Sequence, residues 1–526
     1  MCDISINMDL RWREDARTFT RNRQRILAAR PQIVENLDRI RAGGLKVAEE
    51  YLSDIVDRNV LDDHQAVNVA AMTLPSGCGL CLFDEQGAGK TVSMIFAFDL
   101  LISRDEVDFA LIVAPKSMVS EWAHDFTRFK GDLYKVVVAA GPRIEKRRAL
   151  SSRADVIVTN YETTVTMEAE LRAMLRRRQG RAMLVVDESY FIKNLNAQRT
   201  GSLRRLREYC RRAYVLCGTP APNAPEDLVE QFNIVDFGTT FGDLEVPDDR
   251  DAAVGVVQSA IDSRGLYLRH LKSAVLPDLP LKRFHRVIVP MCPQQQRLYS
   301  AALDSLRKDL LAVDDLTFKR RITSFLARRV TLLQLCSNPT PLVKGYGETP
   351  AKLAALDRIL DDLITQRGEK VIVWSFYTGS LDAVVQRYSR FNPVRYDGSV
   401  TDVGARRQAV QKFQEDDETM LFVANPAAAG AGLTLHRARV AVFESFSNQA
   451  AHYLQSLDRI HRRGQTREVE YIVLLCEDTT EIGEYDRLIQ KQRASETLLG
   501  DPPEGSVTRE TMLQELEQAS ALHPGA

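Results

Sequence analysis

The sequence of 526 residues lacks an excess of charge of either sign, because 70 Lys and Arg residues face 71 Asp and Glu residues. The overall charge therefore indicates no particular class of partner. The chain also lacks any run of about 18 apolar residues, and its N-terminus has no apolar core of the signal-peptide kind. We therefore expect no membrane association and an intracellular, cytoplasmic protein.

Clusters of metal ligands are also missing. Eight cysteines are scattered along the chain apart from the pair Cys78 and Cys81, and eight histidines show no spacing typical of a zinc site. Because no second cysteine pair completes a metal site, we interpret this pair as small apolar residues of a buried strand. A hydrophobic content of 44% with 27% charged residues is typical of a folded globular protein rather than a disordered one.

Short apolar and β-branched runs recur along the chain, each followed by turn residues and a helical stretch. This pattern is typical of buried parallel strands connected by helices. The runs form two series, one at 110–115, 155–160, 183–188 and 213–218 and the other at 370–375, 420–425, 440–445 and 470–475. The sequence therefore predicts an α/β fold with two parallel-sheet lobes.

Breaker-rich stretches and the length of the chain predict several domains, at about 150 residues each. The segment between the lobes includes a helical stretch at roughly 291–335, which we interpret as an insertion. The predicted parts are a helical N-terminal accessory segment (1–60), lobe 1 (61–235), a linker with the helical insertion (236–349), lobe 2 (350–500) and a C-terminal tail (501–526).

The stretch DEQGAGKT at 84–91 ends like a phosphate-binding loop but lacks its first glycine, because Asp84 stands where G-x-x-x-x-G-K-S/T has one. A strand-like run precedes it and a helix-like run follows, as a phosphate cradle requires. We predict that Lys90 reaches the β- and γ-phosphates of ATP and that Thr91 binds magnesium. The backbone amides that would face the phosphates begin with those of Gly87, Ala88 and Gly89.

A second candidate element is LVVDES, in which an apolar strand ends at Asp187 and Glu188. Asp187 can hold Mg²⁺ through water, and Glu188 can orient and polarise an attacking water. An isolated Asp-Glu pair at a strand end usually has no catalytic role, but together with the loop it indicates nucleotide hydrolysis.

Four stretches together resemble motifs I, II, III and VI of the Swi/Snf family, namely DEQGAGKT, DESYFIKN, LCGTPAPN and QSLDRIHRRGQ. Members of this family are helicase-like DNA translocases of superfamily two. The resemblance covers roughly residues 60–495 and is to the bacterial or phage type. It implies two RecA-like lobes with a helical insertion between them, ATP hydrolysis in the cleft between the lobes, and sequence-independent contact with double-stranded DNA. Because the family's phosphate loop commonly begins Asp-Glu, Asp84 fits the pattern.

The resemblance implies further nucleotide-site residues. Gln65, next to His64, matches the residue that reads adenine, and Gln455 lies in motif VI. We expect Gln455, Asp458, Arg459 and Arg462 on one helix, where the two arginines share a face and act as fingers on the γ-phosphate. Gly432 of motif V is a further expected nucleotide contact.

The resemblance also implies contacts with the DNA backbone, which position a strand without reading its sequence. Motif V departs from the family pattern, because ANPAAAGAGLTL has Pro426 and alanines where the family carries hydroxyl and basic residues. This departure concerns stepping along DNA rather than nucleotide chemistry. The expected DNA contacts are Pro115, Lys116, Ser117, Thr159, Tyr161, Ser375, Phe376 and Gly430.

These features favour an ATP-driven translocase on double-stranded DNA that remodels or clears bound complexes, in a bacterial or phage restriction, defence or repair assembly. Two alternatives stay open. One is a strand-separating DNA or RNA helicase of the same superfamily, and the other is a non-catalytic DNA-binding recruitment module, which would be expected to have lost Lys90, Glu188 or an arginine finger. We expect a recruiting protein partner, a chain that can work as a monomer, and association with the nucleoid in a bacterium.

Overall fold

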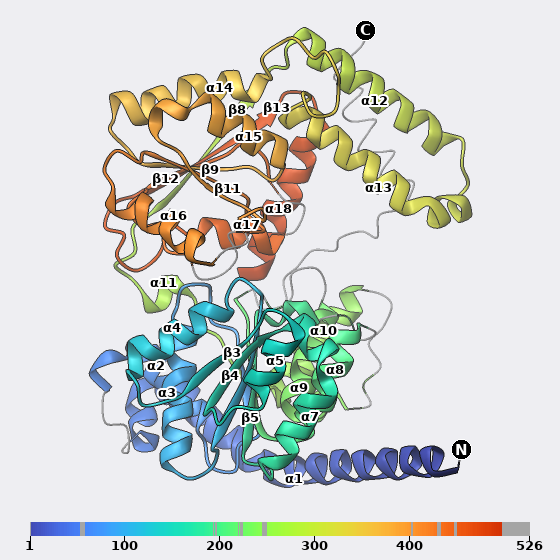
Figure 1. Cartoon of the computed structure of the whole chain (residues 1–526), viewed down its shortest axis with the longest axis vertical. Helices are drawn as coiled ribbons and strands as arrows, with labels where there is room; N and C mark the ends of the chain where they lie inside the picture. Colours follow the sequence, from blue (N-terminus) through green and yellow to red (C-terminus); the bar gives the residue numbers. More distant parts are fainter. Residues whose placement is uncertain are drawn as a thin grey trace. The chain divides into compact units, whose positions relative to one another are not determined.

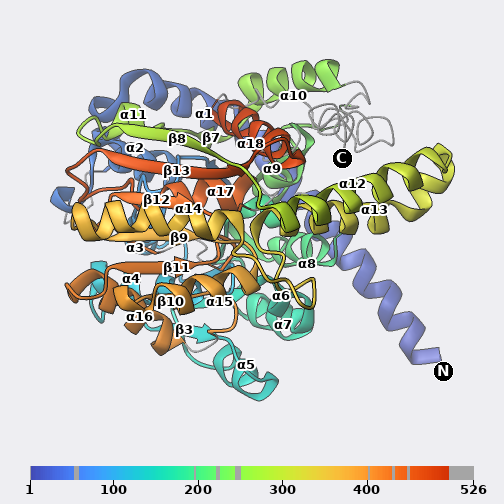
Figure 2. The same cartoon turned by 90° about the horizontal axis from the view of Figure 1, so that it is seen from above.

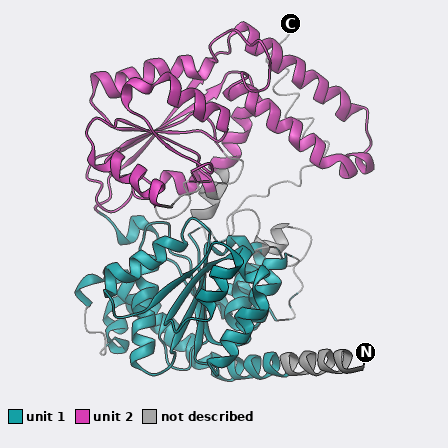
Figure 3. Cartoon of the chain, viewed as in Figure 1, with its two compact units in different colours: residues 1–277, 495–501 teal, residues 278–494, 502–526 magenta. Residues whose placement is uncertain are grey.

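The computed structural model describes residues 2–52, 58–192, 194, 197–218, 220, 225–242, 244, 250–400, 403–428, 433–446 and 450–496. The chain forms two compact units (Figure 3). Unit 1 runs to Pro277, and unit 2 spans Asp278–Ala494. Each unit contains one parallel sheet, as the two series of apolar runs predict.

The sheet of unit 1 has seven strands in the order β3-β4-β2-β5-β6-β1-β7, and every neighbouring pair is parallel. The four predicted runs form β2, β4, β5 and β6, and the sheet is covered by helices on both sides (Figure 1). Its strands are β1 (Gly79–Leu82), β2 (Phe109–Ala114), β3 (Val136–Ala139), β4 (Val156–Asn160), β5 (Ala182–Asp187), β6 (Cys210–Leu216) and β7 (Tyr267–Leu268).

The helices of unit 1 mostly connect one strand to the next, so the carboxyl ends of all seven strands lie at one edge. In open parallel sheets this edge is where ligands bind. The helices are α1 (Cys2–Ala48), α2 (Asp63–Met72), α3 (Lys90–Ser103), α4 (Val119–Lys130), α5 (Arg143–Leu150), α6 (Tyr161–Thr166), α7 (Glu168–Arg177), α8 (Gln198–Arg207), α9 (Val229–Asp236), α10 (Arg250–Arg264) and α11 (Lys272–Val275).

The predicted helical N-terminal segment is α1, which kinks at Gly44 (φ 55°). Its buried residues Ile26, Ile33, Leu37 and Ile40 recur at helical spacing and form one apolar face. Arg30 lies beside this face and forms an ion pair with the fully buried Asp236 at 3.1 Å. The same guanidinium donates hydrogen bonds to Thr239, Thr240 and the carbonyl of Arg264, so α1 is anchored to unit 1 by both apolar and charged contacts.

The sheet of unit 2 has six parallel strands in the order β10-β11-β9-β12-β13-β8. The four predicted runs of the second series form β9, β11, β12 and β13. Side chains alternate between two cores, because Ile372 and Trp374 of β9 face one and Val371 and Val373 the other. The strands are β8 (Lys282–Val289), β9 (Val371–Trp374), β10 (Val394–Tyr396), β11 (Leu421–Ala424), β12 (Val440–Phe443) and β13 (Val469–Cys476).

Helices α16, α17 and α18 cover one face of this sheet, and α14 and α15 cover the other (Figures 1 and 2). The predicted helical insertion is a hairpin of α12 and α13, whose apolar side chains form a core of their own. Asp314 caps α13 by accepting a hydrogen bond from the backbone of Thr317. The helices of unit 2 are α12 (Pro293–Leu311), α13 (Asp315–Ser337), α14 (Ala351–Leu360), α15 (Thr378–Arg387), α16 (Val403–Glu415), α17 (Ala450–Leu457) and α18 (Thr480–Glu496).

The segment that the sequence suggests as a linker, 236–349, supplies strands to both sheets. β7 pairs with β1 in unit 1, and β8 pairs with β13 in unit 2. β8 is not among the predicted apolar runs, because it is an edge strand whose residues are mostly exposed, including Phe284 and Ile288. Within the part of the chain that the structure describes, no helix combines the length and apolar character needed to cross a bilayer.

Replacing Arg30 by Met is expected to lower the free energy of unfolding of unit 1 by about 3–5 kcal/mol, because the buried Asp236 loses its cationic partner. Urea denaturation followed by far-UV circular dichroism measures this difference. Arg39→Met is the matched control, because Arg39 pairs with Glu50 at 3.2 Å on the surface, where loss of the pair costs less than about 1 kcal/mol. Equal small effects of both substitutions would contradict the anchoring role of Arg30.

Candidate nucleotide site

The loop between β1 and α3 has the backbone shape of an anion cradle. Gly87 and Gly89 both have left-handed backbone conformations, with φ of 85° and 87°. A Cβ at Gly89 would lie 2.1 Å from the side-chain nitrogen of Gln65, so a larger residue here would have to displace that side chain. Because α3 begins at Lys90, the free amides of its first turn and its dipole face the loop, and both favour a phosphate there.

Lys90 lies folded into the loop. Its ammonium group donates to the backbone carbonyls of Asp84 at 2.8 Å and Glu85 at 3.3 Å, and the side chain is buried. The positive charge therefore sits at the cradle, where phosphate oxygens could replace the carbonyls as acceptors. The hydroxyl-bearing Thr91 follows directly in the first turn of α3 and is partly exposed.

Asp84, which takes the place of the usual first glycine, is a buried anchor. One carboxylate oxygen accepts a hydrogen bond from Asn68 of α2 at 2.6 Å. The other accepts from the backbone amide of His270 at 2.8 Å, and the His270 ring nitrogen lies 2.9 Å from it. The missing glycine is therefore explained, because the loop is held at this point by side-chain contacts.

The predicted adenine-reading residue Gln65 lies at the start of α2. Its carbonyl oxygen accepts from the backbone amide of Asp62 at 3.0 Å, which completes a capping box. Its amide nitrogen donates to the carbonyl of Ala88 at 3.3 Å, and the ring of neighbouring His64 lies 2.7 Å from the same carbonyl. Both residues therefore fix the loop backbone at Ala88.

Asp187 is the last residue of β5, and Glu188 follows it at the same edge of the sheet. Glu188 has a left-handed backbone (φ 51°), which is strained for a residue with a side chain. Asp187 accepts hydrogen bonds from Trp122 at 2.8 Å and from the backbone amide of Glu188 at 2.9 Å. Burial, and then the negative charge of Glu188, raise the pKa of Asp187 to about 7.

The oxygen atoms of Asp187, Glu188 and Thr91 are ligands of the kind that magnesium prefers. Two adjacent buried carboxylates repel each other, and a divalent cation bound by oxygen ligands would relieve that repulsion. Asp187 and Thr91 are the residues that could hold the ion, directly or through water.

Two of the predicted DNA-contacting side chains of unit 1 are buried. Tyr161 donates to the backbone carbonyl of Asp187 at 2.5 Å, and Thr159 donates to the carbonyl of Ala139 at 2.9 Å. These hydroxyls support the strand ends, and their burial does not favour direct side-chain contact with DNA. Pro115, Lys116 and Ser117 instead lie at least partly exposed after β2.

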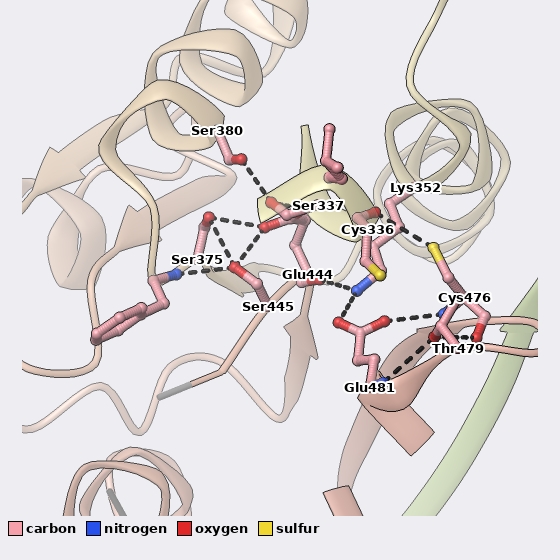
Figure 4. A network of polar contacts seen from close by, with 12 residues as sticks. Cys336, Ser337, Lys352, Ser375, Ser380, Glu444, Ser445, Cys476, Thr479 and Glu481 are labelled. Carbon is pink, nitrogen blue, oxygen red and sulfur yellow. Dashed lines mark hydrogen bonds and ion pairs between the residues drawn. The ribbon is translucent and has the colours of Figure 1, made fainter. Parts of the chain in front are cut away.

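The predicted contacts of unit 2 fall into a buried polar network (Figure 4). The hydroxyls of Ser375 and Ser445 each donate to one oxygen of Glu444 at 2.7 Å, and Ser445 accepts from the backbone amide of Phe376 at 2.9 Å. The ammonium of Lys352 lies behind this cluster, 2.7 Å from the carbonyl of Glu444. Ser375 is thus buried, whereas Phe376 is partly exposed.

The same network contains the one trio of metal-ligand type among the described residues, Cys336, Cys476 and Glu481, whose ligand atoms lie within 4.8 Å of one another. The ammonium of Lys352 lies 2.5 Å from Glu481 and already neutralises its charge. Burial raises the pKa of the Cys336 thiol, which opposes the thiolate form that metals bind. The buried Lys352–Glu481 ion pair therefore accounts for this cluster without a metal ion.

The prediction that Gln455, Asp458, Arg459 and Arg462 share one helix is wrong. Only Gln455 lies in α17, which ends at Leu457. After Leu457 the last turn tightens, with the amide of Arg459 bonded to the carbonyl of Ser456, and the chain continues as turns rather than as helix.

The structure nevertheless brings the two arginines together. Arg459 and Arg462 donate to the same carbonyl, that of Leu433, at 3.3 Å and 2.8 Å. Leu433 directly follows the motif V segment that includes Gly430 and Gly432, and both glycines lie outside the described residues. The side chain of Gln455 is buried.

Sequence reasoning missed several residues that support this site. Trp122, Asn68 and Gln86 each contact a carboxylate of the loop or of the acidic pair, with Gln86 donating to Glu188 at 2.7 Å. Trp122 lies five residues beyond Ser117, one of the expected DNA contacts, and this position was the only sequence signal pointing to it.

Comparison with known protein families shows to which family the chain belongs. Residues 58–341 match the SNF2-related domain, and residues 351–464 match the helicase conserved C-terminal domain. The first match alone covers more than half of the chain, so the chain belongs to the SNF2-related family. This assignment confirms the two RecA-like lobes and the predicted enzyme class, a helicase-like ATP hydrolase.

Individual relatives are distant. The chain is 26% identical over 450 residues to "ISWI chromatin-remodeling complex ATPase ISW1" of Saccharomyces cerevisiae, covering 80% of this chain and 38% of that protein. It is 26% identical over 437 residues to "Uncharacterized ATP-dependent helicase MG018" of Mycoplasma genitalium, covering 80% and 40%. The chain thus spans less than half the length of either relative. The solved "Sulfolobus solfataricus SWI2/SNF2 ATPase core in complex with dsDNA" is 22% identical, with a TM-score of 0.37, covering 87% of this chain and 96% of that one.

The raised pKa of Asp187 predicts a pH-dependent magnesium affinity. Because the ionised carboxylate binds the cation, binding below a pH of about 7 must release the proton first. The magnesium concentration at half-saturation is therefore expected to rise as the pH falls from about 8 to about 6, approaching tenfold per pH unit at the acidic end.

A magnesium titration followed by tryptophan fluorescence measures this affinity, because Trp122 donates directly to Asp187. Trp122→Phe is the control that should remove the fluorescence response. A half-saturation point that does not change with pH would contradict the assignment of Asp187.

Proposed function

We propose that the chain is an ATP-driven translocase on double-stranded DNA that remodels or clears complexes bound there. The observation that carries the proposal is the convergence of the phosphate loop and the Asp187–Glu188 pair at one edge of the unit 1 sheet, bonded to each other through Gln86. Membership of the SNF2-related family supports DNA as the track, as does the naming of similar proteins as chromatin-remodeling ATPases.

The phosphate loop would bind ATP through its backbone. The amides of Gly87 and Gly89 would donate to phosphate oxygens, and Lys90 would neutralise the β- and γ-phosphates. The amide of Ala88 would join them on leaving the carbonyl of Glu85, to which it donates at 3.2 Å. Bound ATP with Mg²⁺ supplies the phosphoanhydride bond and neutralises charge on the phosphates. Thr91 and Asp187 are the residues that would hold the ion.

Glu188 would orient the attacking water and accept its proton, because the side chain is buried next to the loop and fixed by a hydrogen bond. Gln65, in the first turn of α2 and bonded to the loop at Ala88, would sense adenine. Gln455 and Gly432 would contribute from unit 2. Arg459 and Arg462 would stabilise charge on the γ-phosphate during transfer, since planar multi-donor groups suit phosphate.

The proposed DNA contacts are with the backbone and independent of sequence. Lys116 is the exposed cation among them, and Pro115, Ser117 and Phe376 lie partly exposed. We further propose a bacterial or phage defence, restriction or repair setting, a recruiting partner for the N-terminal segment, and a cytoplasmic location. Free thiols at seven of the eight cysteines suit such a reducing compartment.

Steady-state ATP hydrolysis by the purified chain tests this proposal, with no nucleic acid, duplex DNA, single-stranded DNA or duplex RNA added. Duplex DNA is expected to stimulate turnover most, and the stimulation should weaken as salt rises because phosphate contacts release counterions. Glu188→Gln should bind ATP and turn over at least about 100-fold more slowly. Stronger stimulation by single strands or RNA would instead support a strand-separating helicase, and absence of ATP binding and turnover in every condition would support a non-catalytic recruitment module.

A further inference from the structure

Gln86 connects the phosphate loop to the carboxylate proposed to activate water. It lies in the turn between Glu85 and Gly87, and its side-chain amide donates to Glu188 at 2.7 Å. Both side chains are buried, with exposed fractions of 9% for Gln86 and 2% for Glu188. A hydrogen bond to a buried ionised group is stronger than one between neutral groups, so this contact strongly favours one orientation of the carboxylate.

Gly218 provides the space that Gln86 occupies. A Cβ at Gly218 would lie 2.6 Å from the Cγ, 2.8 Å from the Cδ and 2.9 Å from the Nε2 of Gln86. Gly218 lies just beyond β6, the strand next to β5. The glutamine is therefore confined between the loop after β1 and the loop after β6, with its amide directed to the end of β5.

The main chain alone does not fix the carboxylate of Glu188. Its carbonyl accepts from Tyr161 at 3.3 Å and from the amide of Phe191 at 3.2 Å, which holds the backbone in its left-handed conformation. These contacts leave the side-chain torsions of Glu188 to be determined by its side-chain partners. Gln86 is a partner that belongs to the phosphate loop.

We propose that Gln86 is a positioning residue that sets the orientation of Glu188 for water activation and makes that orientation depend on the phosphate loop. The inference rests on the proposed ATP hydrolysis. A shift of the turn at Gln86 when phosphates bind the neighbouring amides would move the carboxylate with it. Glu188 then reaches its working orientation when the loop is occupied, which couples binding to turnover.

Gln86→Met tests the contact, because methionine has a similar length and no donor. The turnover number is expected to fall on the order of 10- to 100-fold, the value of a hydrogen bond to a charged group, while ATP affinity stays within about twofold. In a Glu188→Gln background the same substitution should cost less than about twofold, because the oriented carboxylate is already gone.

An exchange of the two side chains separates positioning from structure. Gln86→Glu alone places two carboxylates in contact and should lower both the melting temperature and the turnover number. Adding Glu188→Gln restores an amide–carboxylate pair with the donor and acceptor exchanged. The melting temperature should then recover, whereas turnover should not.

Gly218→Ala reaches the same contact without changing either partner. Its Cβ would displace Gln86, so turnover should fall as it does in Gln86→Met, and Gly218→Ala should cost little more when Gln86 is already alanine. Gln411→Met is the matched control, because Gln411 donates to Glu415 at 2.9 Å on the exposed surface of α16, and it should leave turnover unchanged.

Each outcome has a defined meaning. Unchanged turnover in Gln86→Met, or an equal loss in the Glu188→Gln background, overturns the inference while wild-type hydrolysis upholds the proposed function. Recovery of turnover in the exchanged pair also overturns it. A wild-type chain that does not hydrolyse ATP under any condition overturns the proposed function and the inference with it.

Discussion

The buried carboxylate of Asp84 fixes the part of unit 1 on which the nucleotide site depends. It receives hydrogen bonds from α2 through Asn68 and from the segment after β7 through His270. The helix before the loop and a segment 186 residues farther along the chain therefore meet at the first residue of the phosphate loop. A glycine here would have no side chain to hold them, and a buried carboxylate without these donors would be costly. Gly87 and Gly89 then give the loop its turn, and Lys90 begins α3.

The carboxyl edge of the unit 1 sheet gathers the remaining groups. Asp187 ends β5, and it is held by Trp122 from α4 and by the backbone of Glu188. Desolvation of two neighbouring carboxylates would destabilise the fold unless a cation or a proton compensates them. The raised pKa of Asp187 is a consequence of this desolvation and of the neighbouring charge. It links the stability of unit 1 to the ion that the site would bind.

Much of the architecture could be predicted from the sequence because buried parallel strands are continuous apolar runs. All eight predicted runs form strands, and the loop DEQGAGKT and the pair Asp187–Glu188 lie at one edge of the sheet. β8 could not be found this way, because it is an edge strand whose mostly exposed residues include Lys282, Arg283 and Arg286. Motif VI was predicted to lie on one helix, but α17 ends at Leu457, and the shared carbonyl of Leu433 brings Arg459 and Arg462 together instead.

The contacts within the site were less accessible to prediction. Trp122, Tyr161 and Gln86 act through tertiary contacts, which residue spacing does not encode. Thr159 and Ser375 were predicted to contact DNA, but the structure buries both. A hydroxyl can donate to a DNA phosphate or to a protein oxygen, and these buried hydroxyls donate to a backbone carbonyl and to a carboxylate.

Equilibrium binding of ATP with magnesium, measured by calorimetry on the full chain and on Lys90→Ala, tests most directly whether this edge of unit 1 is a nucleotide site. Lys412→Ala, on the exposed surface of α16, is the control, and melting temperatures show whether each variant is folded. Wild type and Lys412→Ala are expected to bind ATP equally, and Lys90→Ala at least about tenfold more weakly, because a charge-assisted contact with the phosphates is lost. Equal affinity of a folded Lys90→Ala variant, or no binding by the wild type, would contradict a nucleotide site built on this loop.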